Sequence, residues 1–180
     1  MDHFKKTLMI NPLDSLATLN VASCAIQLGS FAEAEKVLKA TLKYHPDFPD
    51  ARFNLALSQK YQHKDLECIR TFKEVLTQNP HHILAIEQLN RVQLATADTA
   101  GALHTLRLGI SNNPSSPVPL AELANHYLQV KDTVTAVGFA EKAAALPPPN
   151  NGIFSFLALY FTRKGDLQKA NYYQAKLSGN

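Results

Sequence analysis

Residues 46–80 read PDFPDARFNLALSQKYQHKDLECIRTFKEVLTQNP, a segment that begins and ends with proline. These two prolines stand 34 residues apart, and the same interval leads to further prolines on both sides. The complete series consists of Pro12, Pro46, Pro80, Pro114 and Pro148. A fixed period of this length indicates a stack of similar supersecondary units.

Each proline of the series is expected to follow the end of a helix, because proline lacks a backbone N–H and clashes with the preceding turn. Between the prolines, apolar residues recur at helical spacing, and helix-starting residues such as Ser30 and Asp132 stand midway. Each unit is therefore predicted to contain two helices. The expected helices cover residues 2–10, 15–28, 31–45, 49–62, 65–78, 83–96, 99–112, 117–130, 133–146, 151–163 and 166–178.

The chain has 180 residues, 46% of them hydrophobic, and a formal net charge of +3. This length and composition predict one domain with a sizeable core over residues 1–180. The longest nearly apolar run, residues 153–161, is about half of the ~20 residues that a membrane-spanning helix needs. The apolar patch at residues 8–10 is too short for a secretion signal. We therefore expect a cytoplasmic protein without membrane insertion.

Superposing the units aligns large and small residues in fixed columns. In the first helix of each unit, the large column is Val21, Leu55, Leu89, Leu123 and Leu157, followed directly by Ala22, Ala56, Asn90, Ala124 and Ala158. In the second helix, the small column is Ala34, Cys68, Ala102, Ala136 and Ala170, followed four residues later by Leu38, Phe72, Leu106 and Ala140. Small residues let antiparallel helices approach closely, and large ones fill the space between units. Cys68 is thus expected to be a small buried residue rather than a reactive thiol.

This pattern resembles the tetratricopeptide repeat family, whose signature places an aromatic, a Leu-Gly-like pair and Tyr in the first helix, Ala and Phe in the second, and a closing Pro. The last unit matches with Phe154, Leu157, Ala158, Phe161 and Ala170. The resemblance implies an all-α fold, a right-handed α-solenoid of stacked antiparallel helix hairpins. The N-terminal half repeat would cover residues 1–14, and five repeats would cover 15–48, 49–82, 83–116, 117–150 and 151–180.

Two features depart from the family pattern. The chain has no Trp, and Asn90 stands where the other units have alanine. The same unit has Gly109 in its second helix, although glycine inside a helix costs about 1 kcal/mol relative to alanine. We infer that Gly109 makes room for Asn90 against the facing helix.

The two ends of the array carry different expectations. Phe4 and Leu8 align with residues of second helices, so the sequence begins within a unit. Either a lone helix caps the array or the sequence is part of a longer chain, and a further alternative is that this half repeat pairs two copies. At the other end, three columns that are apolar in the inner units become polar, as expected of a capping helix without a neighbour. Their members in the final helix are Gln168, Gln174 and Ser178, which align with Leu66, Phe72 and Leu76 of the second unit.

The resemblance places a partner-binding groove on the first helices, which line the concave side in the family. The corresponding residues here are Leu16, Leu19, Ser23, Ile26, Phe53, Leu57, Lys60, Tyr61, Leu84, Glu87, Arg91, Leu94, Asn125, Leu128, Gln129, Leu159 and Arg163. Such a surface suits an amphipathic helix or an extended apolar peptide, with Arg91 and Asn125 binding carbonyls or a carboxylate. Alternatively, some of these leucines are buried between units. The Lys and Asn clamp of family chaperone adaptors is not reproduced.

A second regular series, Lys5, Lys39, Lys73 and Arg107, predicts a basic ridge on the outer helices. Because the net charge is small and Glu141 interrupts the series, a solvated face is favoured over an anionic partner, and nucleic acid is not expected.

No motif for catalysis, a phosphate loop or a zinc site is present, and His81 and His82 are expected in a solvated turn. The sequence thus favours a non-enzymatic scaffold or adaptor, without cofactor or metal, that binds a protein or peptide segment. The alternatives are a recruiting or regulatory region of a larger enzyme, such as a glycosyl- or sulfo-transferase, and a self-assembling scaffold.

Overall fold

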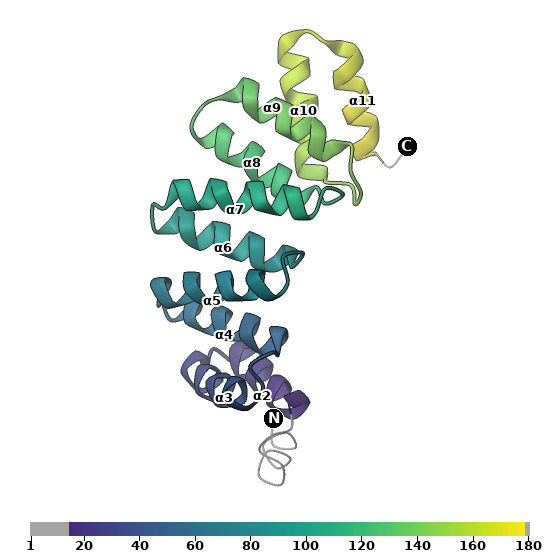
Figure 1. Cartoon of the computed structure of the whole chain (residues 1–180). Helices are drawn as coiled ribbons and strands as arrows, with labels where there is room; N and C mark the ends of the chain where they lie inside the picture. Colours follow the sequence, from purple (N-terminus) through teal and green to yellow (C-terminus); the bar gives the residue numbers. More distant parts are fainter. Residues whose placement is uncertain (1–14, 179–180) are drawn as a thin grey trace. The chain divides into compact units, whose positions relative to one another are not determined.

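The computed structural model describes residues 15–178, and the regular elements in that part of the chain are all α-helices (Figure 1). Their bounds are α2 (Ser15–Gln27), α3 (Phe31–Tyr44), α4 (Pro49–Tyr61), α5 (Asp65–Gln78), α6 (Ile83–Ala95), α7 (Thr99–Asn112), α8 (Val118–Gln129), α9 (Thr133–Ala144), α10 (Asn151–Lys164) and α11 (Leu167–Leu177).

The observed helices confirm the expected ones within two residues at each end. Pro46, Pro80 and Pro114 each stand two residues beyond the last residue of a second helix, and Pro148 lies in the loop after α9. The expected helix at 2–10, together with Pro12, Lys5, Phe4 and Leu8, lies outside the described residues. None of the helices in the described part is long and apolar enough to cross a bilayer.

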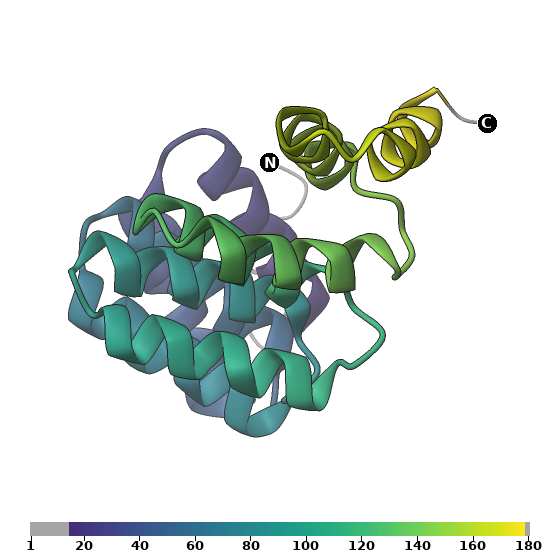
Figure 2. The same cartoon turned by 90° about the horizontal axis from the view of Figure 1, so that it is seen from above.

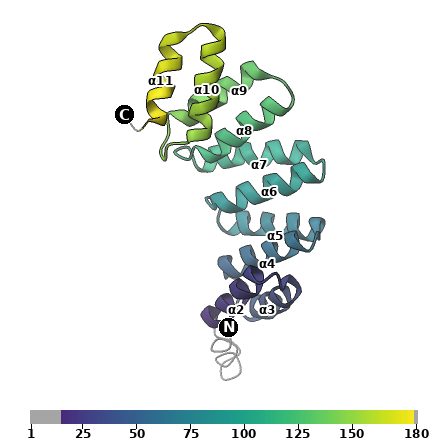
Figure 3. The same cartoon turned by 180° about the vertical axis from the view of Figure 1, so that it is seen from behind.

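The chain divides into two compact units, Met1–Ala102 and Leu103–Asn180, with the division inside α7. In the first unit, α2 packs on α3, α3 on α4, α4 on α5 and α5 on α6, so that hairpins stack in sequence order (Figure 3). In the second unit, α8 pairs with α9 and α10 with α11, and α9 contacts α10. Figure 2 shows α10 and α11 side by side with their axes viewed almost end-on. The prediction of a single domain stays a prediction.

Every hairpin turns through a residue with a left-handed backbone at the same repeat position. These residues are Gly29, His63, Ala97, Lys131 and Gly165, with φ values between 56° and 79°. In each turn the N–H of the next residue donates to a carbonyl five residues earlier, as in Ser30 to Ala25 (2.8 Å) and Asp166 to Phe161 (3.0 Å). This hydrogen bond and the left-handed residue are the ordinary way to end a helix, and here they reverse the chain into the second helix.

Aspartates begin the later second helices. The carboxylates of Asp98, Asp132 and Asp166 accept a hydrogen bond from the backbone N–H three residues on, at 2.9, 3.1 and 3.1 Å. Each thereby satisfies one of the unpaired donors of a helix N-terminus. Ser30 and Lys64 occupy the same position without a side-chain capping bond.

The predicted small and large columns form the core. Ala34, Cys68 and Ala136 are fully buried, and so are Leu38 and Phe72 four residues later. Burial raises the pKa of the Cys68 thiol to about 12, with the Asp65 carboxylate adding to the shift. The thiol therefore stays protonated, which agrees with a packing role.

Three columns were used to predict a capping helix, and the expectation that inner repeats bury their apolar members is wrong for one of them. The column that ends in Gln168 is exposed in earlier repeats as well, since Leu66 is 85% and Val134 is 78% exposed. It lies in the first turn of each second helix, where even large apolar side chains remain uncovered. In the other two columns Phe72 is buried and Leu76 half-buried, whereas Gln174 and Ser178 are exposed, and the capping role of the last helix stays a prediction.

Candidate interaction surface

The first helices of the first unit, α2, α4 and α6, carry the N-terminal half of the predicted groove. A direct polar contact joins α4 to α6, because the Lys60 ammonium donates to the Gln88 side-chain carbonyl at 2.6 Å. One turn further along α6, the Arg91 guanidinium forms an ion pair with Glu87 at 2.5 Å. The predicted residues Lys60, Glu87 and Arg91 therefore lie on neighbouring helices, with their charges held in place by local partners.

A pocket of about 260 Å³ lies between the C-terminal parts of α4 and α6 and the start of α5. Its lining residues are Lys60, Tyr61, His63, Asp65, Arg91, Val92 and Ala95. The half-exposed Tyr61 ring stacks on Phe31 with centroids 4.8 Å apart, and the Lys60 ammonium lies 5.6 Å from the Tyr61 centroid. The pocket thus combines an aromatic surface with charged groups of both signs.

The other predicted residues of this unit divide between surface and core. Leu84 is exposed, and Leu19, Ser23 and Leu94 are half-buried. Phe53 and Leu57 instead pack against the hydrophobic cluster that contains Phe72, and the Phe53 ring lies 5.8 Å from the Phe72 ring. The alternative of ordinary packing therefore describes Phe53 and Leu57 better than a role as free groove residues.

The second unit has its own pocket, of about 170 Å³, between α8 and the first turns of α10. Predicted residues Asn125 and Leu128 line it, together with Ala121, Ala124, Asn150, Gly152, Ile153 and Phe156. The lining contains no charged side chain. Among its two amides, Asn150 accepts a hydrogen bond from the Ile153 N–H and begins α10, whereas Asn125 is exposed. Gln129, Leu159 and Arg163 are also exposed on these first helices.

The predicted pair of Arg91 and Asn125 belongs to two different units, so its joint action stays a prediction. Within each unit, however, predicted residues do meet at a pocket. The pocket of the first unit is charged and aromatic, and the pocket of the second unit is apolar with one exposed amide. The two surfaces suit ligands of different chemistry.

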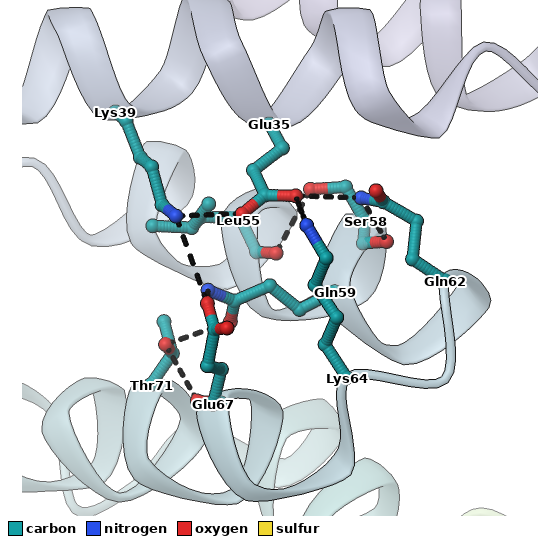
Figure 4. Close-up of polar contacts among 9 residues, drawn as sticks. All are labelled: Glu35, Lys39, Leu55, Ser58, Gln59, Gln62, Lys64, Glu67 and Thr71. Atoms are coloured by element: carbon teal, nitrogen blue, oxygen red, sulfur yellow. Dashed lines mark hydrogen bonds and ion pairs between the residues drawn. The ribbon is translucent and has the colours of Figure 1, made fainter.

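Sequence reasoning missed a polar network between the first two hairpins, which is drawn in Figure 4. The Glu35 carboxylate on α3 is nearly buried and contacts the ammonium groups of Lys39 at 2.6 Å and Lys64 at 2.7 Å. The Gln62 amide donates to the same carboxylate at 2.7 Å. Burial alone would raise the pKa of Glu35, but the bonds from Lys39, Lys64 and Gln62 outweigh it and lower the pKa from 4.5 to about 2. The network therefore keeps a buried carboxylate charged at neutral pH.

The repeat spacing contains the signal that could have revealed this network. Glu35 stands in the column of Ile69, Leu103 and Val137, and is the charged member of an otherwise apolar position in those units. Lys64 stands in the column of the capping aspartates Asp98 and Asp132. The two exceptions are of opposite charge, and in the structure they bind each other.

The predicted basic ridge is partly neutralised. Lys39 contacts Glu35 and also Glu67 at 3.6 Å, whereas Lys36, Arg70 and Lys73 are exposed on α3 and α5. At the turn before α6, His82 accepts a hydrogen bond from the Ala85 N–H at 3.2 Å and stacks on Phe53 at 4.7 Å. His82 is therefore a helix cap. Across residues 15–178, no three His, Cys, Asp or Glu side chains are grouped to hold a metal ion.

The 34-residue hairpins, their closing prolines and their first-helix pockets define a class of protein, the helical-repeat solenoids. A family model described as tetratricopeptide repeat matches residues 1–59. Together with the fold, this match supports the resemblance stated above: residues 1–59 match the tetratricopeptide repeat model, and the chain has the all-α solenoid fold of such proteins.

Two curated proteins are similar in sequence. Protein O-mannosyl-transferase TMTC3 of Homo sapiens is 28% identical over 138 residues, which is 76% of this chain and 15% of the relative. Protein CTR9 homolog of Arabidopsis thaliana is 28% identical over 183 residues, covering 97% of this chain and 17% of the relative. The chain thus spans about a sixth of each relative.

Among solved structures, YrrB has the same fold. Its structure is described as a TPR protein with an unusual peptide-binding site. The two folds superpose with a TM-score of 0.65 at 14% identity, covering 97% of this chain and 90% of YrrB. At this level of identity, the likeness concerns the fold alone.

Proposed function

We propose that this chain is a non-enzymatic interaction scaffold whose first helices bind a peptide or helix of a partner protein. The observation that carries the proposal is the convergence of predicted groove residues on pockets, with Lys60, Tyr61 and Arg91 around one and Asn125 and Leu128 around the other. The peptide-binding site in the description of YrrB, a protein of the same fold, supports this reading. A cytoplasmic location is part of the proposal.

The pocket of the first unit favours a segment with charged and aromatic or apolar side chains. Arg91 and Glu87 can exchange their mutual ion pair for partners on a ligand, and the exposed face of Tyr61 offers apolar area next to Lys60. Ion pairs at such exposed sites give modest affinity, so they contribute mainly selectivity between ligands.

The pocket of the second unit favours one apolar anchor side chain. Ala121, Ala124 and Gly152 leave space beside the Phe156 ring, and the Asn125 amide at the rim can both donate to and accept from a peptide backbone. An apolar side chain buried there would contribute through the area it removes from water. This chemistry does not depend on salt, in contrast to the charged pocket.

The experiment starts by selecting binding peptides from a displayed random library on the whole chain and measuring their Kd by fluorescence anisotropy. Arg91→Glu and Asn125→Ala are then compared with Lys73→Glu and Asn171→Ala, which make the same changes at exposed positions of second helices. We expect at least one groove variant to weaken a selected peptide by about tenfold, a loss of about 1.4 kcal/mol. The two control variants should bind normally. If folded groove variants and controls bind equally, the proposal is wrong.

A second candidate function is supported by the similarity to an O-mannosyl-transferase, of which this chain would match a short stretch. In that case the repeats recruit substrates or regulators for a larger glycosyl-transferase. An antibody raised against this chain tests the idea on cell extracts. A band much heavier than the 19.9 kDa of this chain would support the second candidate. A band of the chain's own mass would contradict it.

A further inference from the structure

The third repeat buries a polar side chain without partners. Asn90 on α6 is 1% exposed, and neither its amide nitrogen nor its amide oxygen has a hydrogen-bond partner. The equivalent residues Ala22, Ala56 and Ala124 are fully buried and apolar. Burying an unpaired amide opposes folding, whereas alanine at the same position favours it. The third repeat is therefore weakened at a position where the other repeats are not.

The turn that follows α6 adds strain in the same repeat. Ala97 has a φ of 61°, in the left-handed region where the Cβ atom crowds the backbone. The first and last repeats have Gly29 and Gly165 at this place, and glycine adopts this conformation without a steric penalty. Ala97 also lacks the polar side chain with which histidine, asparagine or aspartate interacts with the local backbone.

The helix after this turn contains two glycines, Gly101 and Gly109, each less favourable in a helix than alanine. At the first of them, an added Cβ would lie within 2.6 Å of side-chain atoms of Asp98 and Gln93, so alanine at Gly101 would make the ends of these two side chains move. Those side chains are joined by a hydrogen bond of 3.1 Å, and Gln93 is buried. Gly101 thus leaves room for the hydrogen bond that the buried Gln93 amide donates to Asp98, at the cost of a weaker helix former.

Taken together, residues 83–112 carry an unpaired buried amide, a strained turn and two helical glycines, and the division between the compact units falls inside this segment. We propose that residues 83–112 form a local opening unit, which unfolds before the hairpins α4–α5 and α10–α11. Repeat proteins permit this behaviour because each repeat has its own stability and is coupled mainly to its neighbours.

Opening would have a consequence for binding, and this step rests on the proposed function. α6 contributes Arg91, which pairs with Glu87, so the pocket is complete only while α6 is folded. A ligand bound there would select the closed state, and its apparent affinity would fall in proportion to the open population. The segment would then act as a stability switch for that pocket.

Hydrogen exchange with mass spectrometry on the whole chain, without any ligand, tests the opening itself. Amides of residues 83–112 should exchange about tenfold faster, or more, than those of residues 65–78 and 153–164 after correction for intrinsic rates. The double variant Asn90→Ala with Ala97→Gly should slow exchange in 83–112 by about tenfold and leave residues 153–164 unchanged.

A matched control variant places the destabilising residue in a different repeat. Ala56→Asn places the same buried amide in the second repeat, where Ala56 is fully buried, and should speed exchange in residues 49–78. If residues 83–112 exchange no faster than the other two segments in the wild-type chain, the proposal is wrong. It is also wrong if the double variant leaves the exchange of 83–112 unchanged. Because the experiment needs no ligand, failure of peptide binding would not alter either outcome.

Discussion

Hairpins α4–α5 in the first unit and α10–α11 in the second share one backbone plan and an apolar core, but they differ in chemistry at four equivalent positions. Four equivalent positions, three repeats apart, are polar in the first hairpin and aromatic or glycine in the other. The pairs are Arg52 with Phe154, Gln59 with Phe161, His63 with Gly165, and Thr71 with Tyr173. The repeat therefore fixes where two helices meet, but it does not fix how they are held together.

In α4–α5 the two helices are joined by directional polar bonds. The Thr71 hydroxyl donates to the Gln59 side-chain carbonyl at 2.8 Å, and both side chains are buried. The Arg52 guanidinium bonds Glu74 at 2.8 Å and Gln78 at 3.1 Å. Because each buried group depends on a particular partner, this hairpin specifies its register strictly and tolerates the loss of one partner poorly.

In α10–α11 the same positions form a stack of rings. The Tyr173 ring lies 6.0 Å from Phe161 and 6.3 Å from Phe154, both close to parallel. Lys169 lies 4.6 Å from the Phe161 ring and pairs with Glu141 of α9 at 2.7 Å. This hairpin is stabilised mainly by buried aromatic area, so its energy should follow side-chain volume rather than individual bonds.

The largest expected effect comes from removing one ring of the stack. Phe161→Ala should lower the free energy of unfolding by about 3–5 kcal/mol, because it leaves a cavity where Phe161 is now buried against Tyr173. Urea unfolding followed by circular dichroism measures this loss. Tyr172→Ala removes a half-exposed ring from the same hairpin and should cost much less. Equal losses for both variants would show that the stack is not the source of stability.

The next largest effect is expected from acid, which weakens the contact between Glu35 of α3 and the turn of α4–α5. Contacts with the two lysines and Gln62 hold the pKa of Glu35 near 2, below its unfolded value of 4.5, so the charged carboxylate stabilises the fold above pH 4.5. This contribution is lost as the pH falls from 4.5 toward 2, and it amounts to at most about 3 kcal/mol.

Glu35→Gln isolates that contribution. The variant should be less stable than the wild type at pH 7, and the difference should shrink toward zero near pH 2, as measured by urea unfolding at each pH. A difference that stays constant between pH 7 and pH 2.5 would contradict the assigned role. Phe161→Ala provides a comparison, because its effect involves no titrating carboxylate and should persist in acid.

Sequence reasoning predicted the helices well because proline and the apolar period act within a few residues of each helix end. It also brought together Lys60, Tyr61 and Arg91, which line one pocket because the repeat fixes the face of α4 and α6 that they occupy, and their part in binding stays a prediction. It failed for Phe53, whose column gave no sign that the ring would pack on Phe72 and His82. That outcome depends on neighbouring side chains rather than on position in the repeat.

The Glu35 network was missed for a related reason. Its members come from α3 and from the turn between α4 and α5, so no single helical pattern contains them. The turn position with a left-handed backbone could be predicted only in part. Gly29 and Gly165 stand at this position, but the other repeats have His63, Ala97 and Lys131, which do not indicate a positive φ. Superposing the repeats shows which residue types all units share at a given position. The exceptions become interpretable once they are compared with one another.

The hydrogen-bonded pair of α4–α5 allows a direct test of how the two cores differ. Thr71→Val should cost about 1–2 kcal/mol, because it leaves the buried Gln59 side-chain carbonyl without its donor. Gln59→Leu should cost less, because the Thr71 hydroxyl can still donate to the Glu67 backbone carbonyl at 2.9 Å. The double variant should cost less than the sum, since both polar groups are then gone. Chemical unfolding of the four proteins gives the coupling energy. Strict additivity would mean that the pair does not join the helices energetically.

The smallest expected effect lies at the turns of the same two hairpins. His63 and Gly165 occupy equivalent left-handed positions, with φ of 56° and 79°. His63→Gly should relieve backbone strain and raise stability by less than about 1 kcal/mol, because the extra flexibility of glycine in the unfolded chain offsets part of the gain. Gly165→Ala should cost about 1 kcal/mol through the strain alone, since no neighbouring atom lies within 4 Å of the added Cβ. Thermal unfolding of both variants measures these shifts. If His63→Gly raises stability and Gly165→Ala lowers it, every hairpin requires a left-handed residue at this position, which α10–α11 provides with glycine and α4–α5 with a strained histidine. Stability changes of the same sign in both variants would contradict this requirement.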